Sequence, residues 1–236
     1  IVASGNHVLV YDTCDGGLIQ TLKGHKDKVH CVSYAKNGLK FASGSADKTV
    51  IIWSSKLEGL LKYSHSDSVQ CLVFNPLSHQ LASCALTDFA FWSSEQKAVQ
   101  KHKTNIKINA CSWTNDGQYL ALGLNNGVIS IRNKLGEEKG RIERPQNPAI
   151  WALSWSTYKD DQTDTLCVTD WNKTLSFYTL GGKLVGKERN IGFEALMVSY
   201  FPKGEYILIS GLNKACVMYT RDGIKLDVIG DQQNAW

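Results

Sequence analysis

The sequence lacks the features that mark membrane proteins, disulfide-stabilised domains and several common classes of enzyme. No apolar run approaches the roughly 18 residues that a membrane-spanning helix needs. The seven cysteines are an odd number without a CxxC pair, so we expect reduced thiols in the core of a cytosolic protein. The GxxxxGK[ST], HExxH and GxSxG motifs are absent, as is a cluster of His and Cys ligands. Together these absences favour a protein that is not an enzyme and needs no cofactor or metal.

The sequence also lacks a visible boundary between domains. It has only four prolines and no long linker rich in Pro, Gly or Ser, so we predict a single domain over residues 1–236. The chain opens at Ile1 with neither an initiator Met nor a signal peptide, and it stops at Asn234-Ala235-Trp236, where a new repeat would begin. We therefore interpret the chain as a fragment of a longer protein.

What the sequence does contain is a repeat with a period of about forty residues. Six strand-like runs each end in an aromatic residue, or in Arg132 in the fourth run. The closing residues, at spacings of 42, 39, 40, 46 and 41, are Tyr11, Trp53, Trp92, Arg132, Tyr178 and Tyr219. A period near forty with several short strands in each unit is typical of a β-propeller.

The second repeat shows the unit most clearly, because its apolar residues alternate and its turns are rich in Asn, Asp and Gly. We expect its four strands at Val29–Tyr34, Lys40–Ser45, Thr49–Trp53 and Leu60–Tyr63. The same order recurs along the chain. We predict an all-β, WD40-type β-propeller of about seven blades when complete. The chain would supply five complete blades and parts of a first and a last one.

Four polar or aromatic positions of the second repeat resemble the WD-repeat pattern. Gly24-His25 precedes the first strand, Ser43 lies in the second, Asp47 follows it, and Trp53 ends the third. In that family the Asp and His form hydrogen bonds with each other, with a strand Ser and with the Trp indole. The resemblance therefore implies a structural brace of these four residues, since a buried charge is tolerated when it is paired and fully hydrogen-bonded.

An Asp–His–Ser set also suggests a catalytic triad. However, Ser43 would lie within a strand rather than on an exposed turn, and nothing nearby suggests an oxyanion hole. We therefore interpret the brace as structural. Other repeats keep it only in part: the third has His65, Asp88 and Trp92, and the fourth has His102 and Arg132.

Longer segments resemble one WD-repeat family, the WD-repeat subunits of intraflagellar transport complex A. Among the segments that carry this resemblance are Gly24–Val29, Phe41–Lys48, Ile51–Gly59, Trp113–Gly123 and Pro202–Leu208. The resemblance implies a non-enzymatic scaffold that binds other subunits of the complex, in the cytoplasm, the cilium and the ciliary base. It further implies a role in retrograde ciliary transport and in the entry of membrane receptors into the cilium. The alternative is a general WD40 adaptor, such as a ubiquitin-ligase substrate receptor.

The loops that join consecutive repeats are basic, although the net charge of the chain is only +4. In a propeller these loops open on one face, where we count twelve Lys or Arg against five Asp or Glu. The densest of them carry Lys26, Lys28, Lys103, Lys107, Arg141 and Arg144. Such a face favours an acidic partner, which could be a neighbouring subunit, an acidic cargo tail or a phosphoinositide-bearing membrane. The alternative is a solvated surface. We expect no nucleic-acid partner, because no binding motif and no aromatic residues accompany the lysines.

Overall fold

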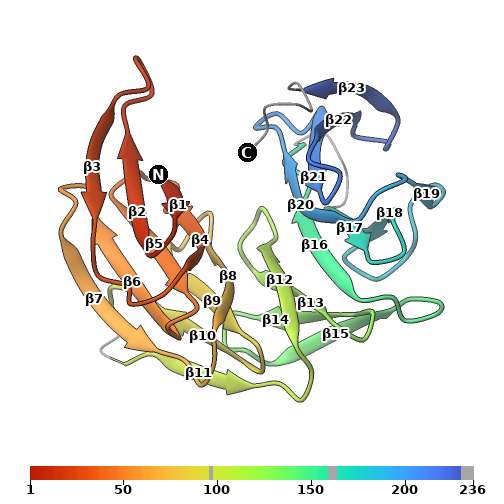
Figure 1. Ribbon diagram of the computed structural model, residues 1–236. Coiled ribbons are helices and arrows are strands. Elements are labelled where there is room, and N and C mark those ends of the chain that lie inside the picture. Colours follow the sequence, from red (N-terminus) through yellow and green to blue (C-terminus); the bar gives the residue numbers. More distant parts are fainter. Residues whose placement is uncertain (96–97, 159–163, 230–236) are drawn as a thin grey trace. The chain divides into compact units, whose positions relative to one another are not determined.

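The computed structural model describes residues 1–95, 98–158 and 164–229 (Figure 1). In these ranges all regular structure is β-strand, so they contain no helix able to cross a membrane. The strands form six antiparallel sheets, of which one has three strands and five have four. The acidic stretch Thr157–Asp164 and the last residues, Asn234–Trp236, fall wholly or partly outside the described residues.

The chain divides into two compact units, Ile1–Ile108 and Asn109–Trp236. In the first unit, the three-stranded sheet consists of β1 (Val2–Ser4), β2 (His7–Tyr11) and β3 (Leu18–Leu22). The next sheet consists of β4 (Val29–Tyr34), β5 (Lys40–Ser45), β6 (Thr49–Ser54) and β7 (Gly59–Ser64). The third consists of β8 (Val69–Phe74), β9 (Leu81–Ala85), β10 (Asp88–Trp92) and β11 (Gln100–Lys103).

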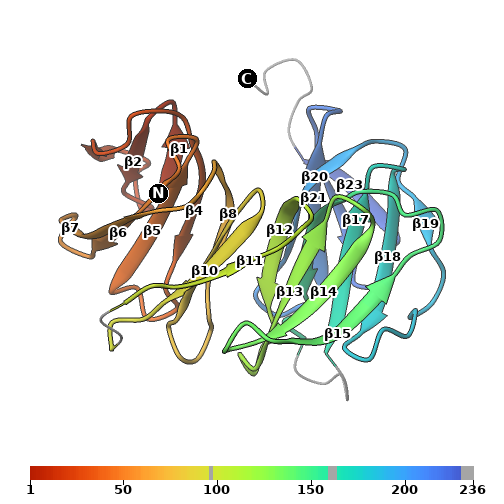
Figure 2. The ribbon, with the colours of Figure 1, turned by 90° about the horizontal axis from the view of Figure 1, so that it is seen from below.

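The second unit carries three four-stranded sheets (Figure 2). The first consists of β12 (Ile108–Trp113), whose first residue ends the other unit, β13 (Tyr119–Leu124), β14 (Val128–Asn133) and β15 (Glu138–Glu143). The second consists of β16 (Ile150–Trp155), β17 (Thr165–Asp170), β18 (Thr174–Thr179) and β19 (Arg189–Asn190). The third consists of β20 (Ala195–Tyr200), β21 (Tyr206–Gly211), β22 (Cys216–Thr220) and β23 (Lys225–Ile229).

Each four-stranded sheet is a meander in which every strand pairs with its neighbours in the chain. The turn between the second and third strands repeats one conformation. Its last residue is left-handed in four sheets, with φ of 68° at Lys48, 80° at Gly127, 63° at Lys173 and 57° at Lys214. An Asp or Asn stands before each of them, and such residues initiate tight turns through their side chains. The turn therefore follows from the local sequence.

Within each unit, the core lies between sheets that are neighbours in sequence, and it depends on close approach at one glycine. In the first unit, Val50 and Ile52 of β6 pack with Leu72 and Leu81 of the following sheet. A Cβ added to Gly44 of β5 would lie 2.5 Å from Val69 Cγ1. In the second unit, a Cβ added to Gly123 of β13 would lie 2.6 Å from Ile150 Cγ2. Only glycine lets the two sheets pack this closely at these positions.

The predicted all-β class is thus confirmed, and in consecutive sheets Trp53 is the last residue but one, and Trp92 the last residue, of the third strand. The total of about seven blades and the absence of a domain boundary stay predictions.

Candidate functional site

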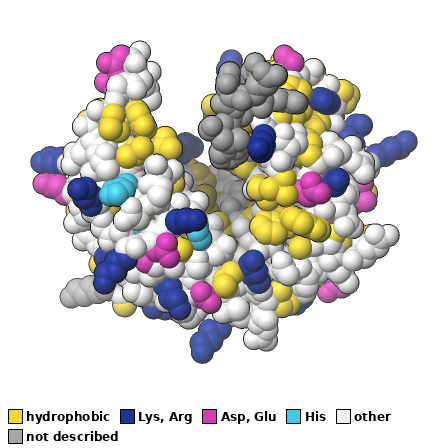
Figure 3. All heavy atoms as spheres, in the orientation of Figure 1, with side chains coloured by type: hydrophobic (Ala, Val, Ile, Leu, Met, Phe, Trp, Pro, Cys, Tyr) yellow, Lys and Arg dark blue, Asp and Glu magenta, His cyan; other side chains and the backbone are white. Residues whose placement is uncertain are grey.

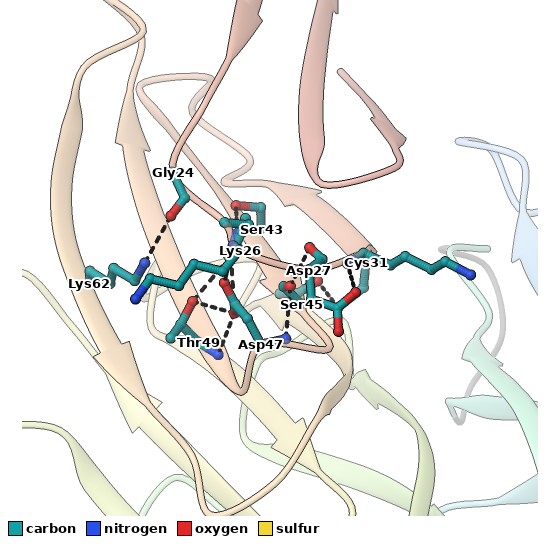
Figure 4. A network of polar contacts seen from close by, with 12 residues as sticks. Gly24, Lys26, Asp27, Cys31, Ser43, Ser45, Asp47, Thr49 and Lys62 are labelled. Carbon is teal, nitrogen blue, oxygen red and sulfur yellow. Dashed lines mark hydrogen bonds and ion pairs between the residues drawn. The ribbon is translucent and has the colours of Figure 1, made fainter.

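The four residues of the proposed brace lie together at the sheet β4–β7. Figure 4 shows two of them, Ser43 and Asp47, with Thr49 next to Asp47. His25 enters from the segment after β3, Ser43 comes from β5, Asp47 from the β5–β6 turn and Trp53 from β6. The distance from His25 Nδ1 to Asp47 Oδ2 is 3.2 Å, and that from His25 Nε2 to Ser43 Oγ is 2.8 Å. The Trp53 indole N–H donates to Ser43 Oγ at 2.9 Å.

Donor and acceptor chemistry fixes the direction of these hydrogen bonds. Asp47 can only accept and the Trp53 indole can only donate. A neutral His25 therefore donates from Nδ1 to Asp47 and accepts at Nε2 from the Ser43 hydroxyl, whose oxygen accepts from Trp53. Burial holds the pKa of His25 below its ordinary value, although Asp47 acts in the opposite direction. The brace is therefore built around an uncharged imidazole.

Asp47 also holds the backbone on both sides of the brace. Its Oδ2 accepts the Lys26 N–H at 2.7 Å, and its Oδ1 accepts the Thr49 N–H at 2.9 Å and the Thr49 hydroxyl at 2.6 Å. Burial alone would raise the pKa of Asp47, but the hydrogen bonds from Thr49 and Lys26 outweigh it and hold that pKa far below its usual range. Thr49 was not predicted, although its place two residues after Asp47 is a usable signal.

The next sheet repeats the brace with one exchange of residue. His65 Nδ1 lies 3.2 Å from Asp88 Oδ1, and His65 Nε2 lies 2.8 Å from Ser83 Oγ. The Tyr63 hydroxyl lies 2.8 Å from Ser83 Oγ. It takes the place of the Trp53 indole, which donates to Ser43 in the preceding sheet. The sequence predicted that Trp92 would be the aromatic residue of this brace, but Trp92 packs in the apolar core instead. Tyr63 lies in β7 of the preceding sheet, so no signal within the third repeat points to it.

Two expectations for the fourth repeat are corrected. His102 is not at the brace position: it lies in β11, paired with Phe89, and its ring stacks on the Phe89 ring with centroids 4.9 Å apart. Arg132, at the position of the Trp, forms a different network. Its Nε donates to Ser130 Oγ at 2.8 Å, and its Nη2 pairs with Glu138 Oε2 at 2.7 Å.

The fifth repeat contains a buried ionic network that was not predicted from the sequence. Arg144 Nη1 pairs with Asp170 Oδ2 at 2.5 Å, and Arg144 Nε donates to the Tyr178 hydroxyl at 3.2 Å. The Arg144 and Asp170 side chains are only 3% and 1% exposed. Burial opposes the charge of Arg144, but Asp170 and Tyr178 more than offset it and raise the pKa of the guanidinium. Arg144 was predicted to lie on the surface and to contact a binding partner. It is buried instead, because it pairs with the buried carboxylate of Asp170.

The other predicted basic residues differ in accessibility. Lys26, Lys28 and Lys103 are exposed, and Lys107 is half-buried. Arg141 is exposed but pairs with Glu138 at 3.4 Å and with Glu143 at 3.7 Å. On the visible face of the first unit, Lys and Arg side chains are interspersed with Asp and Glu (Figure 3). The exposed cations on this face are therefore separated by acidic side chains and do not form one continuous basic patch.

The residues of the brace have a structural role. Ser43 is fully buried, and its hydroxyl is engaged by both His25 and Trp53. A nucleophile must reach a substrate, so this arrangement of Asp, His and Ser does not form a catalytic triad. The Asp carboxylate holds backbone N–H groups instead, which fixes the loop that leads into β4.

The buried histidines predict a loss of stability in mild acid. The pKa values of His25 and His65 are both lowered, chiefly by burial, so the unfolded chain binds more protons than the folded chain below their ordinary value of 6.5. Stability from this source is complete above about pH 6.5 and falls as the pH decreases below it. Asp47, whose pKa is depressed, adds a further loss below about pH 4.

The measurement is the urea midpoint at about pH 7.5 and at about pH 5.5. We expect a lower midpoint at the acid value. The variant with His25→Gln and His65→Gln should be less stable at the higher pH but should lose less on acidification. An equal loss in the variant and the parent would contradict the assignment to these histidines.

The repeated antiparallel four-stranded sheets, together with the His–Ser–Asp–Trp brace of one sheet and its Tyr63 variant in the next, define a WD-repeat β-propeller protein. A solved structure shows the same fold: the β-propeller domain of Cps50 (Swd1) from Myceliophteria_thermophila aligns with a TM-score of 0.82, over 96% of this chain and 81% of that one, at 16% identity. More particularly, the chain belongs to the family described as the IFT122 first beta-propeller, which matches residues 1–236.

Curated relatives agree with this assignment. The chain is 62% identical over 238 residues to the "Intraflagellar transport protein 122 homolog" of Xenopus tropicalis. It is 47% identical over 297 residues to the protein of the same name from Homo sapiens. Both alignments cover 100% of this chain, but only 20% and 24% of the respective relatives. The chain thus spans about a fifth to a quarter of their length.

Proposed function

We propose that the chain is part of a non-enzymatic scaffold subunit of intraflagellar transport complex A. The observation that carries this proposal is the match over the whole chain, at 62% identity, to a relative named as an intraflagellar transport protein. The site chemistry is consistent with it, because the conspicuous polar side chains of the brace are engaged within the protein. The protein would act at the cilium, the ciliary base and in the cytoplasm, in retrograde transport and in the entry of membrane receptors.

We also propose that a further sheet completes a propeller of about seven blades. Two apolar sheet faces support this idea. Met197 of β20 is 55% exposed, on the face of its sheet that points away from the Val198 core. Val2 of β1 is 49% exposed, on the face opposite the one that carries Val8. A sheet of a propeller buries both faces, and neighbouring blades would cover these side chains.

Co-purification from ciliated cells tests the proposed function. We expect the full-length protein to recover the other subunits of complex A, and we expect a version without residues 1–236 to recover fewer of them or less cargo. Recovery of ubiquitin-ligase components in place of complex A subunits would support the general adaptor reading instead. Normal complex assembly, transport and receptor entry without residues 1–236 would contradict a scaffold role for this part.

The exposed lysines predict a measurable electrostatic contribution to partner binding. Replacing Lys26, Lys28 and Lys103 by Glu should slow association with complex A subunits and reduce the salt dependence of the rate, since charge complementarity acts mainly on association. The matched control replaces Lys36, Lys56 and Lys203, exposed lysines of other turns, by Glu. If both triple variants associate like the parent across a salt series, the loop lysines are only solvated surface.

A further inference from the structure

Two cysteines lie directly opposite each other in neighbouring strands of the third sheet. Cys71 of β8 and Cys84 of β9 are partners in the antiparallel register, and their Sγ atoms lie within 4.8 Å of each other. Among the residues that the structure describes, no two cysteines are joined by a disulfide, so both side chains are thiols. Opposite residues of an antiparallel pair have Cα atoms about 4.5–5.5 Å apart, a separation that a disulfide can span. Rotation of the two side chains is therefore sufficient to join them.

This pair lies on the face of the third sheet that the brace does not use. Leu72, the residue after Cys71, packs in the core shared with the preceding sheet and lies opposite Ser83 of the brace. Successive residues of a strand point to opposite faces of the sheet. Cys71 and Cys84 therefore point away from that core.

The second sheet provides a comparison within the same unit. Cys31 of β4 takes the place of Cys71, since each cysteine follows a shift of register, at Val29/Cys31 and at Val69/Cys71. The residue opposite Cys31 is Gly44, where an added Cβ would lie 2.8 Å from the Cys31 sulfur. The need for a small buried hydrophobic residue explains Cys31 and Cys71 alike. It does not explain the second thiol opposite Cys71.

The two thiols of the pair differ in their access to solvent. Cys71 is half-buried, whereas Cys84 is 0% exposed. A thiolate that a small oxidant can reach is oxidised first, and a neighbouring thiol can then displace the oxygen. An S–H group forms only weak hydrogen bonds, so such contacts would not keep the two sulfur atoms apart. Cys71 is thus placed to react first, and Cys84 is placed to complete the link.

We propose that Cys71 and Cys84 form a site of reversible oxidation, at which a hydroperoxide converts the two thiols into a cross-strand disulfide. The Cys71 thiolate attacks an oxygen of hydrogen peroxide, so that an S–O bond forms, the O–O bond breaks and one water leaves. The Cys84 sulfur then attacks the Cys71 sulfur, so that the S–S bond forms, the S–O bond breaks and a second water leaves. The two thiols together lose two electrons and two protons, which the peroxide accepts. A soluble thiol reverses the reaction by exchange.

Peptide mass spectrometry of the full-length protein tests this site. The native protein is treated with hydrogen peroxide, and the remaining thiols are alkylated before digestion. Trypsin leaves both cysteines in one peptide, because neither Lys nor Arg stands between Lys62 and Lys97, but chymotrypsin can separate them at Phe74. We expect two chymotryptic peptides that stay joined, with a mass lower by two hydrogen atoms than the sum of the reduced peptides. The joined form should disappear when a thiol reductant is added before alkylation.

Variants decide whether these two thiols react with each other. Cys84→Ala should abolish the joined peptides and leave Cys71 as a sulfenic acid that dimedone traps. Cys71→Ser changes the half-buried member of the pair instead, and it should also abolish the joined peptides. Cys31→Ser is the matched control, because it removes a thiol from the equivalent place in the second sheet. The yield of joined peptides in this control should equal that of the parent.

Three results would overturn the proposal: no joined peptides after peroxide treatment, predominant linkage of Cys71 or Cys84 to another cysteine, or an equal loss of the joined form in Cys31→Ser and Cys84→Ala. The outcome is independent of the proposed scaffold function, which the co-purification experiment tests without reference to these thiols.

Discussion

Replacing Arg144 by alanine should lower the free energy of unfolding by about 3–5 kcal/mol, the largest effect that we expect from a single substitution. The reason is the position of its partner. Asp170 is 1% exposed, so the variant would leave a carboxylate buried without its counterion. Asp170 also accepts the Thr174 N–H at 3.0 Å, so the β17–β18 turn would be affected as well. Chemical denaturation at neutral pH measures the change.

Arg141 provides the control, because it lies three residues away, in β15, and its side chain is 46% exposed. Arg141→Ala should change stability by no more than about 1 kcal/mol, as is usual for solvated ion pairs. The double variant Arg144→Met with Asp170→Leu should recover much of the loss, because it removes both charges together. Similar effects of Arg144→Ala and Arg141→Ala would show that the network of Arg144 does not stabilise the fold.

Asp47→Ala should be the second most damaging change, at about 3 kcal/mol, since it removes the acceptor of several hydrogen bonds at once. The donors are the Lys26 N–H, the Thr49 N–H and hydroxyl, and the His25 ring. Each donor left without a partner in a buried site costs about 1–3 kcal/mol, and access of water to the exposed side reduces the sum. The loop into β4 should also open more often.

Asp27→Ala is the matched control, because the exposed Asp27 lies in the loop into β4 that Asp47 holds. Among the described residues, its side chain accepts only the N–H of its neighbour Lys28. We expect its effect to stay within about 0.5 kcal/mol. Hydrogen exchange in the full-length protein adds a local measurement, in which the amides of Lys26 and Thr49 should exchange faster in Asp47→Ala alone. Equal melting temperatures and equal exchange for the two variants would show that the brace contributes nothing.

The strands, their order and the brace of the second repeat could all be predicted from the sequence. Those features are local: alternation along Val29–Tyr34 predicts β4, a short apolar run rich in β-branched residues predicts β6, and Asp47 with Lys48 predicts the turn between β5 and β6. His25, Ser43 and Trp53 could be assigned because each occupies a fixed place relative to its own strand, and pairing in a meander brings those places together.

The side chains that complete the other networks could not be predicted in this way, because they depend on packing between sheets. Tyr63 reaches Ser83 from the preceding sheet, and the basic loop residue Arg144 turns inward to Asp170. These arrangements depend on how neighbouring sheets pack and on whether a charge finds a buried counterion. The repeat spacing predicts neither the packing of neighbouring sheets nor the pairing of a buried charge. A period of forty residues indicates the position of a residue within its own repeat, but not its contacts with the next repeat.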